Sequence, residues 1–186
     1  NPTDIVLSAS TVDENSAADT VIATLTAVDP DGAPGNAAPF TYQLVAGDGT
    51  NDTDNALVKI VGDQLQVAGS IDFETNPTLE LNIQVTDDGG LTYTEAVTVT
   101  VGDLNENPTA INLSATSIDE NNASGAVVAT LSTIDPDGAA SGFAGPFTYE
   151  LVTGLGDTDN GSFTISGSNL QINDPANFEG QNSFDI

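Results

Sequence analysis

The sequence predicts an all-β fold built from tandem Greek-key β-sandwiches, the second of which is truncated. Three observations lead to this prediction. Apolar and polar residues alternate along several short runs, clusters of Gly, Asp, Asn and Pro separate these runs, and the whole pattern occurs twice. Alternation with a period of two and many β-branched residues is typical of strands with one buried face. The separating residues are those that tight turns require.

The alternating runs of the first copy define its expected strands. These strands span residues 5–7, 21–27, 40–45, 57–61, 65–67, 79–85 and 96–101. No part of the chain shows the period of an amphipathic helix. Seven short strands in about 100 residues favour a Greek-key sandwich of immunoglobulin-like architecture. The chain has no Cys and no Trp, so it lacks the residues that mark antibody domains.

The internal repeat sets the expected domain boundaries. The matching segments are Asn1-Pro2-Thr3 with Asn107-Pro108-Thr109, Asp29-Pro30-Asp31-Gly32 with Asp135-Pro136-Asp137-Gly138, and Asp72-Phe73-Glu74 with Asn177-Phe178-Glu179. We therefore expect a first domain at residues 1–106, including a linker at 103–107, and a second at residues 107–186. The second domain is expected to be incomplete, because it contains no counterpart of most of the first copy's last two strands. Since the chain does not start with Met, we expect it to be part of a longer protein.

The charge of the chain is strongly one-sided. Its 186 residues include 28 Asp and Glu but a single basic side chain, which gives a formal net charge of −27. Nucleic-acid binding needs basic patches, so it is not expected, and anionic membrane surfaces repel such a chain. No apolar run approaches the roughly 20 residues that span a bilayer. Because like charges oppose a compact state, we expect the folded chain to take up cations.

The carboxylates gather at the expected strand ends and in the linker. The linker reads Asp103-Leu104-Asn105-Glu106-Asn107-Pro108, so oxygen-bearing side chains occupy most of its positions. Asp and Asn are also common turn residues, which is the simpler explanation for any one of these positions. Their recurrence at the same strand ends of the second copy favours a shared role as metal ligands.

These motifs together resemble the cadherin repeat family, including the tandem repeats of large bacterial surface adhesins of the RTX type. Cadherin repeats carry a Glu near the first strand, matched by Glu14, and an Asp-x-Glu motif before the sixth strand, matched by Asp72-Phe73-Glu74. Their linker is similar to residues 103–108. Their next repeat supplies an Asp-x-Asp motif, matched by Asp135-Pro136-Asp137, and an Asp after the sixth strand, which in the first copy is Asp87.

The resemblance implies calcium as the cofactor. The implied ligands are Glu14, Asp72, Glu74, Asp103, Leu104, Asn105, Glu106, Asn107, Asp135 and Asp137 at the junction of the copies, with Asp29, Asp31, Asp87, Glu120 and Glu179 at equivalent positions. The donor chemistry agrees independently, because Ca²⁺ prefers carboxylate and carbonyl oxygens. Without Cys or His the chain lacks the usual ligands of zinc, copper and haem iron.

The resemblance also implies a function outside the cell. We expect an extracellular, membrane-associated cell-adhesion module, in which calcium stiffens an extender that holds a ligand-binding region of a biofilm-type adhesin away from the cell. The alternative is a module that itself mediates calcium-dependent homophilic or carbohydrate binding. The expected partners are neighbouring repeats of the same protein, a strand-completing segment for the second repeat, and a carbohydrate or cell-surface ligand of the full-length protein.

Two other interpretations of the acidic residues are disfavoured. Residues 48–54 resemble a calcium-binding EF-hand loop, but Thr53 replaces the required Gly and Lys59 replaces the closing Glu. We therefore expect a polar loop there. Paired carboxylates also serve glycoside hydrolysis, but the chain has no His, no Trp and only three Tyr. We do not expect an enzyme.

Overall fold

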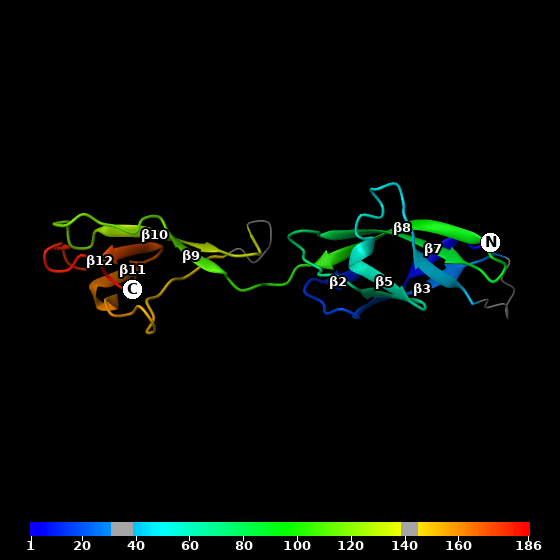
Figure 1. Ribbon diagram of the computed structural model, residues 1–186, viewed down its shortest axis with the longest axis horizontal. Helices are drawn as coiled ribbons and strands as arrows, with labels where there is room; N and C mark the ends of the chain where they lie inside the picture. The colour runs from blue at the N-terminus through cyan, green and yellow to red at the C-terminus, as the bar shows by residue number, and fades with distance from the viewer. Residues whose placement is uncertain (31–38, 139–144) are drawn as a thin grey trace. The chain divides into compact units, whose positions relative to one another are not determined.

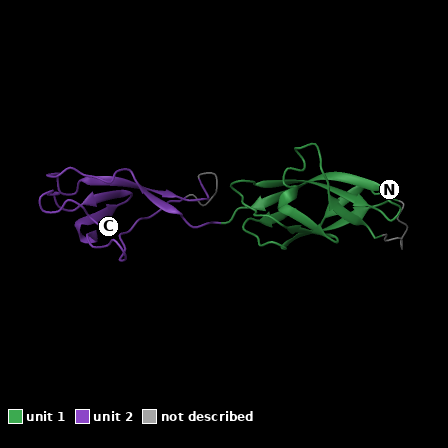
Figure 2. Cartoon of the chain, viewed as in Figure 1, with its two compact units in different colours: residues 1–104 green, residues 105–186 purple. Residues whose placement is uncertain are grey.

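The computed structural model describes residues 1–30, 39–138 and 145–186. These residues form two compact units, residues 1–104 and 105–186 (Figure 2). Both units consist of β-strands joined by turns and loops (Figure 1), and the only helices among the described residues are two short 3-10 turns. The all-β prediction is confirmed. No helix within the described ranges is long and apolar enough to cross a membrane.

Unit 1 contains two four-stranded sheets. The first has the order β1 (Asp4–Leu7), β3 (Val21–Val28), β6 (Gln64–Val67) and β5 (Val58–Val61). The second has the order β2 (Thr11–Asp13), β8 (Thr92–Gly102), β7 (Thr78–Thr86) and β4 (Thr41–Leu44). All pairs are antiparallel except β2 with β8, which is parallel. A short 3-10 helix, η1 (Asn55–Leu57), precedes β5.

Each run expected from alternation forms a strand, with small shifts at the ends. β2 was not predicted from the sequence, because its three residues bury only Val12 and are too few to show a period. Leu57 was expected in a strand, whereas it is the last residue of η1. Short elements are the hardest to recognise, since their position depends on tertiary partners rather than on their own pattern.

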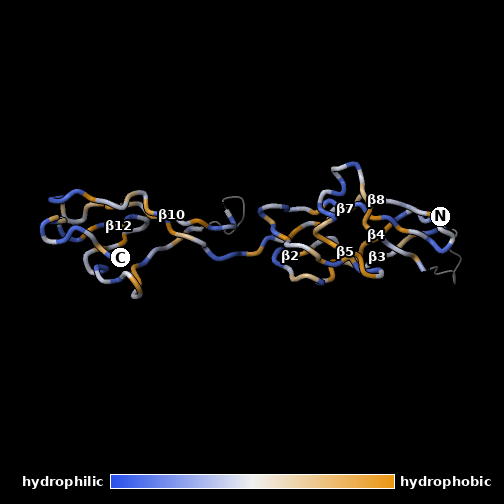
Figure 3. The backbone as a smooth tube through the Cα atoms, viewed as in Figure 1, coloured by the Kyte–Doolittle hydropathy of each residue, from blue (hydrophilic) through white to orange (hydrophobic). Residues whose placement is uncertain are grey.

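The core of unit 1 lies between its two sheets. Along β7 the inward residues Leu79, Leu81, Ile83 and Val85 are fully buried, and they join a continuous apolar cluster. Figure 3 shows hydrophobic residues concentrated along the strands, with hydrophilic residues at the turns between them. Each fully buried aliphatic side chain contributes about 1.5–3 kcal/mol. Aliphatic burial therefore holds the two sheets together without help from disulfides.

Unit 2 repeats the first sheet of unit 1. Its strands have the order β11 (Phe163–Ser166), β12 (Asn169–Ile172), β10 (Val127–Ile134) and β9 (Ala110–Leu113). The 3-10 helix η2 (Asn160–Ser162) precedes β11, as η1 precedes β5. The described residues of unit 2 form no second sheet. Its buried cluster is correspondingly small and centres on Phe163, Leu170 and Ile172.

The single lysine makes an ion pair on the surface of unit 1. The Lys59 ammonium donates to the Asp19 carboxylate, and the two side chains are 41% and 72% exposed. Exposed pairs of this kind contribute about 0–1 kcal/mol, because solvent screens them. We expect Lys59→Gln to lower the free energy of unfolding by less than about 1 kcal/mol, measured by urea denaturation. A loss above about 2 kcal/mol would mean that this pair is a structural anchor.

Candidate metal centre

Three carboxylates meet where β8 ends in unit 1. Glu14 directly follows β2, while Asp72 and Glu74 lie in the turn between β6 and β7. One carboxylate oxygen from each residue lies within 4.8 Å of the others. We call these residues the Glu14 cluster. All three were predicted as ligands from the sequence, and the fold brings them together from segments distant in the sequence.

Backbone hydrogen bonds fix the position of Glu14, which is only 1% exposed. Its Oε2 accepts the Phe73 N–H at 3.0 Å, and its Oε1 accepts the Leu104 N–H at 2.8 Å. The Glu14 N–H itself donates to the Gly102 carbonyl at 3.0 Å. A carboxylate oxygen has two lone pairs, so each oxygen keeps one for a further partner. Glu14 is thus a rigid buried acceptor rather than a solvated surface charge.

The other two carboxylates of the cluster are exposed and arranged by the turn between β6 and β7. The Thr75 N–H and hydroxyl donate to the two oxygens of Asp72, at 3.2 and 2.9 Å. Two like charges about 4 Å apart repel by about 1 kcal/mol even in water. The sequence has no basic side chain other than Lys59, which bonds to Asp19. A bound cation is therefore the simplest source of compensating charge, and the hard oxygen donors suit Ca²⁺.

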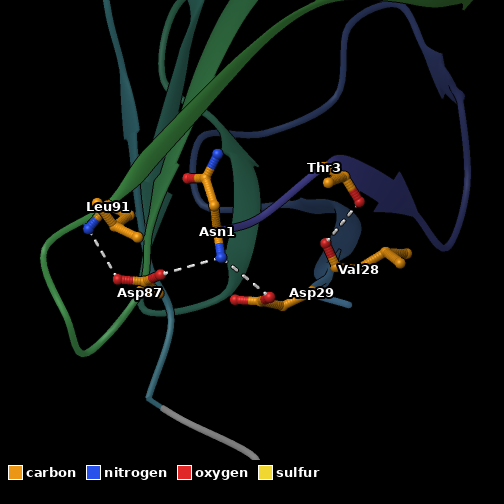
Figure 4. A network of polar contacts seen from close by, with 6 residues as sticks. All are labelled: Asn1, Thr3, Val28, Asp29, Asp87 and Leu91. Carbon is orange, nitrogen blue, oxygen red and sulfur yellow. Dashed lines mark hydrogen bonds and ion pairs between the residues drawn. The ribbon is translucent and has the colours of Figure 1, made fainter. Parts of the chain in front are cut away.

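Two further acidic residues, Asp29 and Asp87, lie near the opposite end of β8, beside Asn1. Figure 4 shows the Asn1 ammonium between Asp29 and Asp87. Its nitrogen is 3.2 Å from Asp29 Oδ1 and 3.9 Å from Asp87 Oδ2, while Asp87 Oδ1 accepts the Leu91 N–H at 2.8 Å. The fold thus places Asp29 and Asp87, two carboxylates that were predicted as metal ligands, beside the same backbone nitrogen. Asp31, predicted with them, lies outside the described residues.

Unit 2 arranges its own predicted ligands after β10. The Asp137 N–H donates to Asp135 Oδ1 at 3.1 Å, and the Glu106 N–H donates to Asp137 Oδ2 at 2.9 Å. Asp137 is 2% exposed, and its Oδ1 is buried with no hydrogen-bond partner among the described residues. An unsatisfied buried carboxylate oxygen costs free energy. A metal ion at Asp137 Oδ1 would remove that cost.

The remaining predicted ligands fall into two sets. Asp103 and Leu104 follow β8 at the end of unit 1, and Asn105 and Asn107 lie in the segment that leads to β9. The second set, Glu120 and Glu179, is the unit 2 counterpart of Glu14 and Glu74. Both residues are exposed, and Glu120 accepts the Phe178 N–H at a longer 3.3 Å. Among the described residues no group of three carboxylates closes around Glu120.

The acids of the loop before η1 have a local structural role. Asp48 Oδ1 accepts the Thr50 hydroxyl at 2.5 Å and the N–H groups of Thr50 and Asn51. These bonds, that of the Thr50 hydroxyl first, lower the pKa of Asp48 below its usual value. Asp159, in the equivalent loop of unit 2, has a lowered pKa because it accepts the Asp185 N–H. Both carboxylates organise their loops through backbone donors.

Two tyrosines of unit 1, Tyr42 and Tyr93, have pKa values above the usual value. Burial, followed by the negative charge of Asp63, raises the pKa of Tyr42 above its usual value. Burial, followed by the charges of Glu95 and Asp4, raises that of Tyr93. Nearby carboxylates disfavour the phenolate form of each ring. Neither tyrosine is therefore prepared to act as a general base at neutral pH.

Comparison with known proteins decides the family. The sequence profile described as Cadherin domain matches residues 8–102, which is most of unit 1. The chain belongs to the cadherin family. Cadherin domains are extracellular adhesion modules of cell-surface proteins, they bind calcium as a family, and they are structural rather than catalytic. The predicted cadherin resemblance is confirmed.

The relatives are animal cell-surface proteins. Protocadherin Fat 2 of Rattus norvegicus is 36% identical over 146 residues, which cover 76% of this chain and 3% of the relative. Protocadherin beta-1 of Homo sapiens is 34% identical over 111 residues, which cover 57% of this chain and 13% of the relative. This cadherin chain thus spans a small fraction of the length of these relatives. The narrower resemblance to bacterial adhesins stays a prediction.

Solved structures agree with the cadherin fold. The extracellular domain of Protocadherin GammaB4 is similar with a TM-score of 0.59 and 27% identity, covering 96% of this chain and 28% of that one. Human Protocadherin-24 EC1-2 Form II is similar with a TM-score of 0.65 and 21% identity, covering 94% of this chain and 76% of that one. The similarity to Protocadherin-24 concerns the fold alone.

Proposed function

We propose that this chain is a calcium-stiffened extender within a larger cell-surface adhesion protein, where it holds a ligand-binding region away from the cell. The observation that carries the proposal is the Glu14 cluster. A buried carboxylate with both oxygens fixed by backbone N–H groups faces two further carboxylates. Folding places these like charges together, which is favourable only if a cation joins them.

The proposed calcium ligands come from each unit. They are Glu14, Asp72, Glu74, Asp103, the carbonyl of Leu104, the amide of Asn105, Glu106, the carbonyl of Asn107, Asp135 and Asp137. The buried Oδ1 of Asp137, which has no hydrogen-bond partner among the described residues, supports the unit 2 members of this set. Asp29, Asp31 and Asp87 are proposed as the equivalent set near Asn1, because Asp29 and Asp87 lie close to the same backbone nitrogen. Calcium bound by the ligands within the linker, residues 103–107, would restrict its bending.

The extender role is favoured over direct recognition by the composition of the chain. Interfaces and carbohydrate sites rely on aromatic side chains, whereas the chain has only 5% aromatic residues and no Trp. The small share of its relatives that it covers, 3% for Protocadherin Fat 2, also suits one module among many. Our proposal for the full-length protein includes a surface adhesin of the bacterial type.

Calorimetric titration with calcium after chelation tests the metal site. We expect Glu74→Gln to weaken calcium binding by about tenfold or more, because it removes a charge from the cluster at nearly constant shape. Its thermal stability should fall relative to wild type in calcium but not in chelator, since a ligand stabilises only the state that binds it. Glu150→Gln is the matched control, as Glu150 is exposed and belongs to neither predicted set.

Two results would contradict the proposal. The first is an absence of heat from calcium binding to the wild-type chain at about millimolar concentration. The second is an equal loss of stability for Glu74→Gln in calcium and in chelator, which would make Glu74 a folding residue. Stiffening has its own test, because small-angle scattering curves of the wild-type chain should differ with and without calcium. Superimposable curves would remove the stiffening role and leave the binding site intact.

A further inference from the structure

Four asparagines of the chain lie in the motif Asn-x-Ser/Thr, with a middle residue other than Pro. This motif is the acceptor for N-linked glycans in secreted proteins. Because cadherin domains are extracellular, the modification is relevant to this chain. The four motifs start at Asn51, Asn112, Asn122 and Asn160. A motif this short also arises by chance, so the surroundings of each asparagine decide whether the folded chain accommodates a glycan.

Asn112 lies on the outward face of an edge strand. It belongs to β9, opposite Ser132 of β10, and its side chain is exposed. Side chains alternate between the two faces of a strand. In unit 1 the counterpart of Asn112 is Val6, which is 44% exposed, whereas the flanking Ile5 and Leu7 pack against the core. Since Val6 is exposed in a unit that has both sheets, this position of the repeated module faces solvent.

The amide of Asn112 is available for a covalent partner. Its side chain makes no hydrogen bond within residues 1–30, 39–138 and 145–186. Its cross-strand neighbour Ser132 is small and exposed, so the space beside the amide is open. A glycan replaces one hydrogen of Nδ2 with a bulky sugar. At Asn112 this replacement costs neither a hydrogen bond nor packing.

The other three asparagines are half-buried, and their amides already hold backbone groups. Asn122 Oδ1 accepts the Ala176 N–H at 2.7 Å, and its Nδ2 donates to the Ala123 carbonyl at 2.9 Å. Asn51 Oδ1 accepts a backbone N–H of its own loop at 3.0 Å. A Cβ added at Gly47 would lie 1.8 Å from that oxygen, so the amide packs directly on the backbone.

Asn160 is held by a bond that belongs to the repeated module. Its Nδ2 donates to the Val152 carbonyl at 2.9 Å, and its Oδ1 is buried. In unit 1 the counterpart Asn55 makes the same bond to the Val45 carbonyl, also at 2.9 Å. A sugar at this nitrogen would push apart the backbone segments that the amide joins. Of the four asparagines, Asn112 is therefore the one whose modification leaves the fold unchanged.

We propose that Asn112 is the acceptor of an N-linked glycan and that the other three motifs stay unmodified in the folded chain. The oligosaccharide comes from a lipid-linked diphosphate donor. Asn112 Nδ2 forms a bond to the anomeric carbon of the first sugar, and the bond from that carbon to the diphosphate oxygen breaks. Nδ2 loses one proton, and the electron pair of the broken bond leaves with the lipid diphosphate. The inference rests on the cell-surface location in the proposed function but not on calcium binding.

Secretion of the full chain from cultured animal cells tests the proposal, because these cells supply the transferase and the donor. Peptide-N-glycosidase removes the glycan and converts each modified Asn to Asp, which heavy-oxygen water marks by mass. We expect the mark at Asn112 in most molecules and at the other three asparagines in a small minority. Glycosidase treatment should therefore produce a single shift of the chain in electrophoresis.

Three variants locate the acceptor. Asn112→Gln keeps an exposed amide but destroys the motif, so the shift should be lost. Ser114→Thr keeps the motif and the hydroxyl that accepts the Thr130 N–H, so the shift should remain. Asn182→Gln is the matched control, because Asn182 is exposed and lies outside the motif. Circular dichroism of the variants should match that of the wild-type chain.

Three outcomes would overturn the proposal. One is a secreted wild-type chain without any glycan. Another is a glycan on one of the other three asparagines and none on Asn112. The third is equal occupancy of all four motifs, which would show that the fold does not select among them. Calcium titration of the same secreted chain tests the proposed function separately, because Asn112 is not among the proposed calcium ligands.

Discussion

Replacing Glu14 by alanine is expected to lower the free energy of unfolding of unit 1 by about 2–4 kcal/mol even in the presence of chelator. The reason is that its two oxygens accept the N–H groups of Phe73 and Leu104 in a buried setting. Alanine leaves both donors without their acceptor, and each unsatisfied donor costs about 1–3 kcal/mol. Removing one negative charge from the cluster relieves electrostatic repulsion, which offsets the loss of stability by about 1 kcal/mol at most. In calcium the loss should be larger, because a ligand disappears as well.

Glu120→Ala is the matched control for this prediction. Glu120 is the unit 2 counterpart of Glu14, but it is exposed and makes a single bond to Phe178 N at 3.3 Å. We expect it to change stability by less than about 1 kcal/mol. Hydrogen exchange measured on separate peptides of each unit distinguishes the two effects. Equal effects of the two substitutions in chelator would show that the buried hydrogen bonds of Glu14 contribute little.

The strands were predictable from the sequence because alternation records which side chains are buried. The strands β3 and β7 are eight and nine residues long, their apolar and polar residues alternate over most of that length, and the observed bounds lie close to the expected ones. In β2 three residues carry too little pattern, and its place is set by parallel pairing with β8. The sequence therefore indicated the long strands, while the short strand required knowledge of its partner.

The candidate site was predictable only in part. The family resemblance identified Glu14, Asp72 and Glu74, and the fold places all three together. It did not indicate that the Glu14 carboxylate is buried and held by two backbone N–H groups, because a backbone donor has no sequence signature. It also missed Asn55 and its counterpart Asn160. The available signal was the recurrence of Asp-Asn at the start of η1 and of η2.

The second large effect is expected in the core. Leu81→Ala should lower the free energy of unfolding of unit 1 by about 2–5 kcal/mol, because Leu81 is fully buried and alanine leaves a cavity. Leu81 lies near the middle of β7, opposite Val97 of β8, and on the other side of β7 the N–H groups of Glu80 and Asn82 donate to Asp54 and Asn55. A sheet held in this way relaxes little into the cavity. Urea denaturation, followed by exchange in unit 1 peptides, measures the loss.

Ile186→Ala is the matched control, since Ile186 is the counterpart of Leu81 in unit 2 and is 44% exposed. We expect it to cost less than about 1 kcal/mol in the chain alone, because a half-exposed side chain loses little burial. The difference between the two substitutions measures how much the burial of Leu81 contributes to the stability of unit 1. An equal cost for both substitutions would show that burial of Leu81 contributes little.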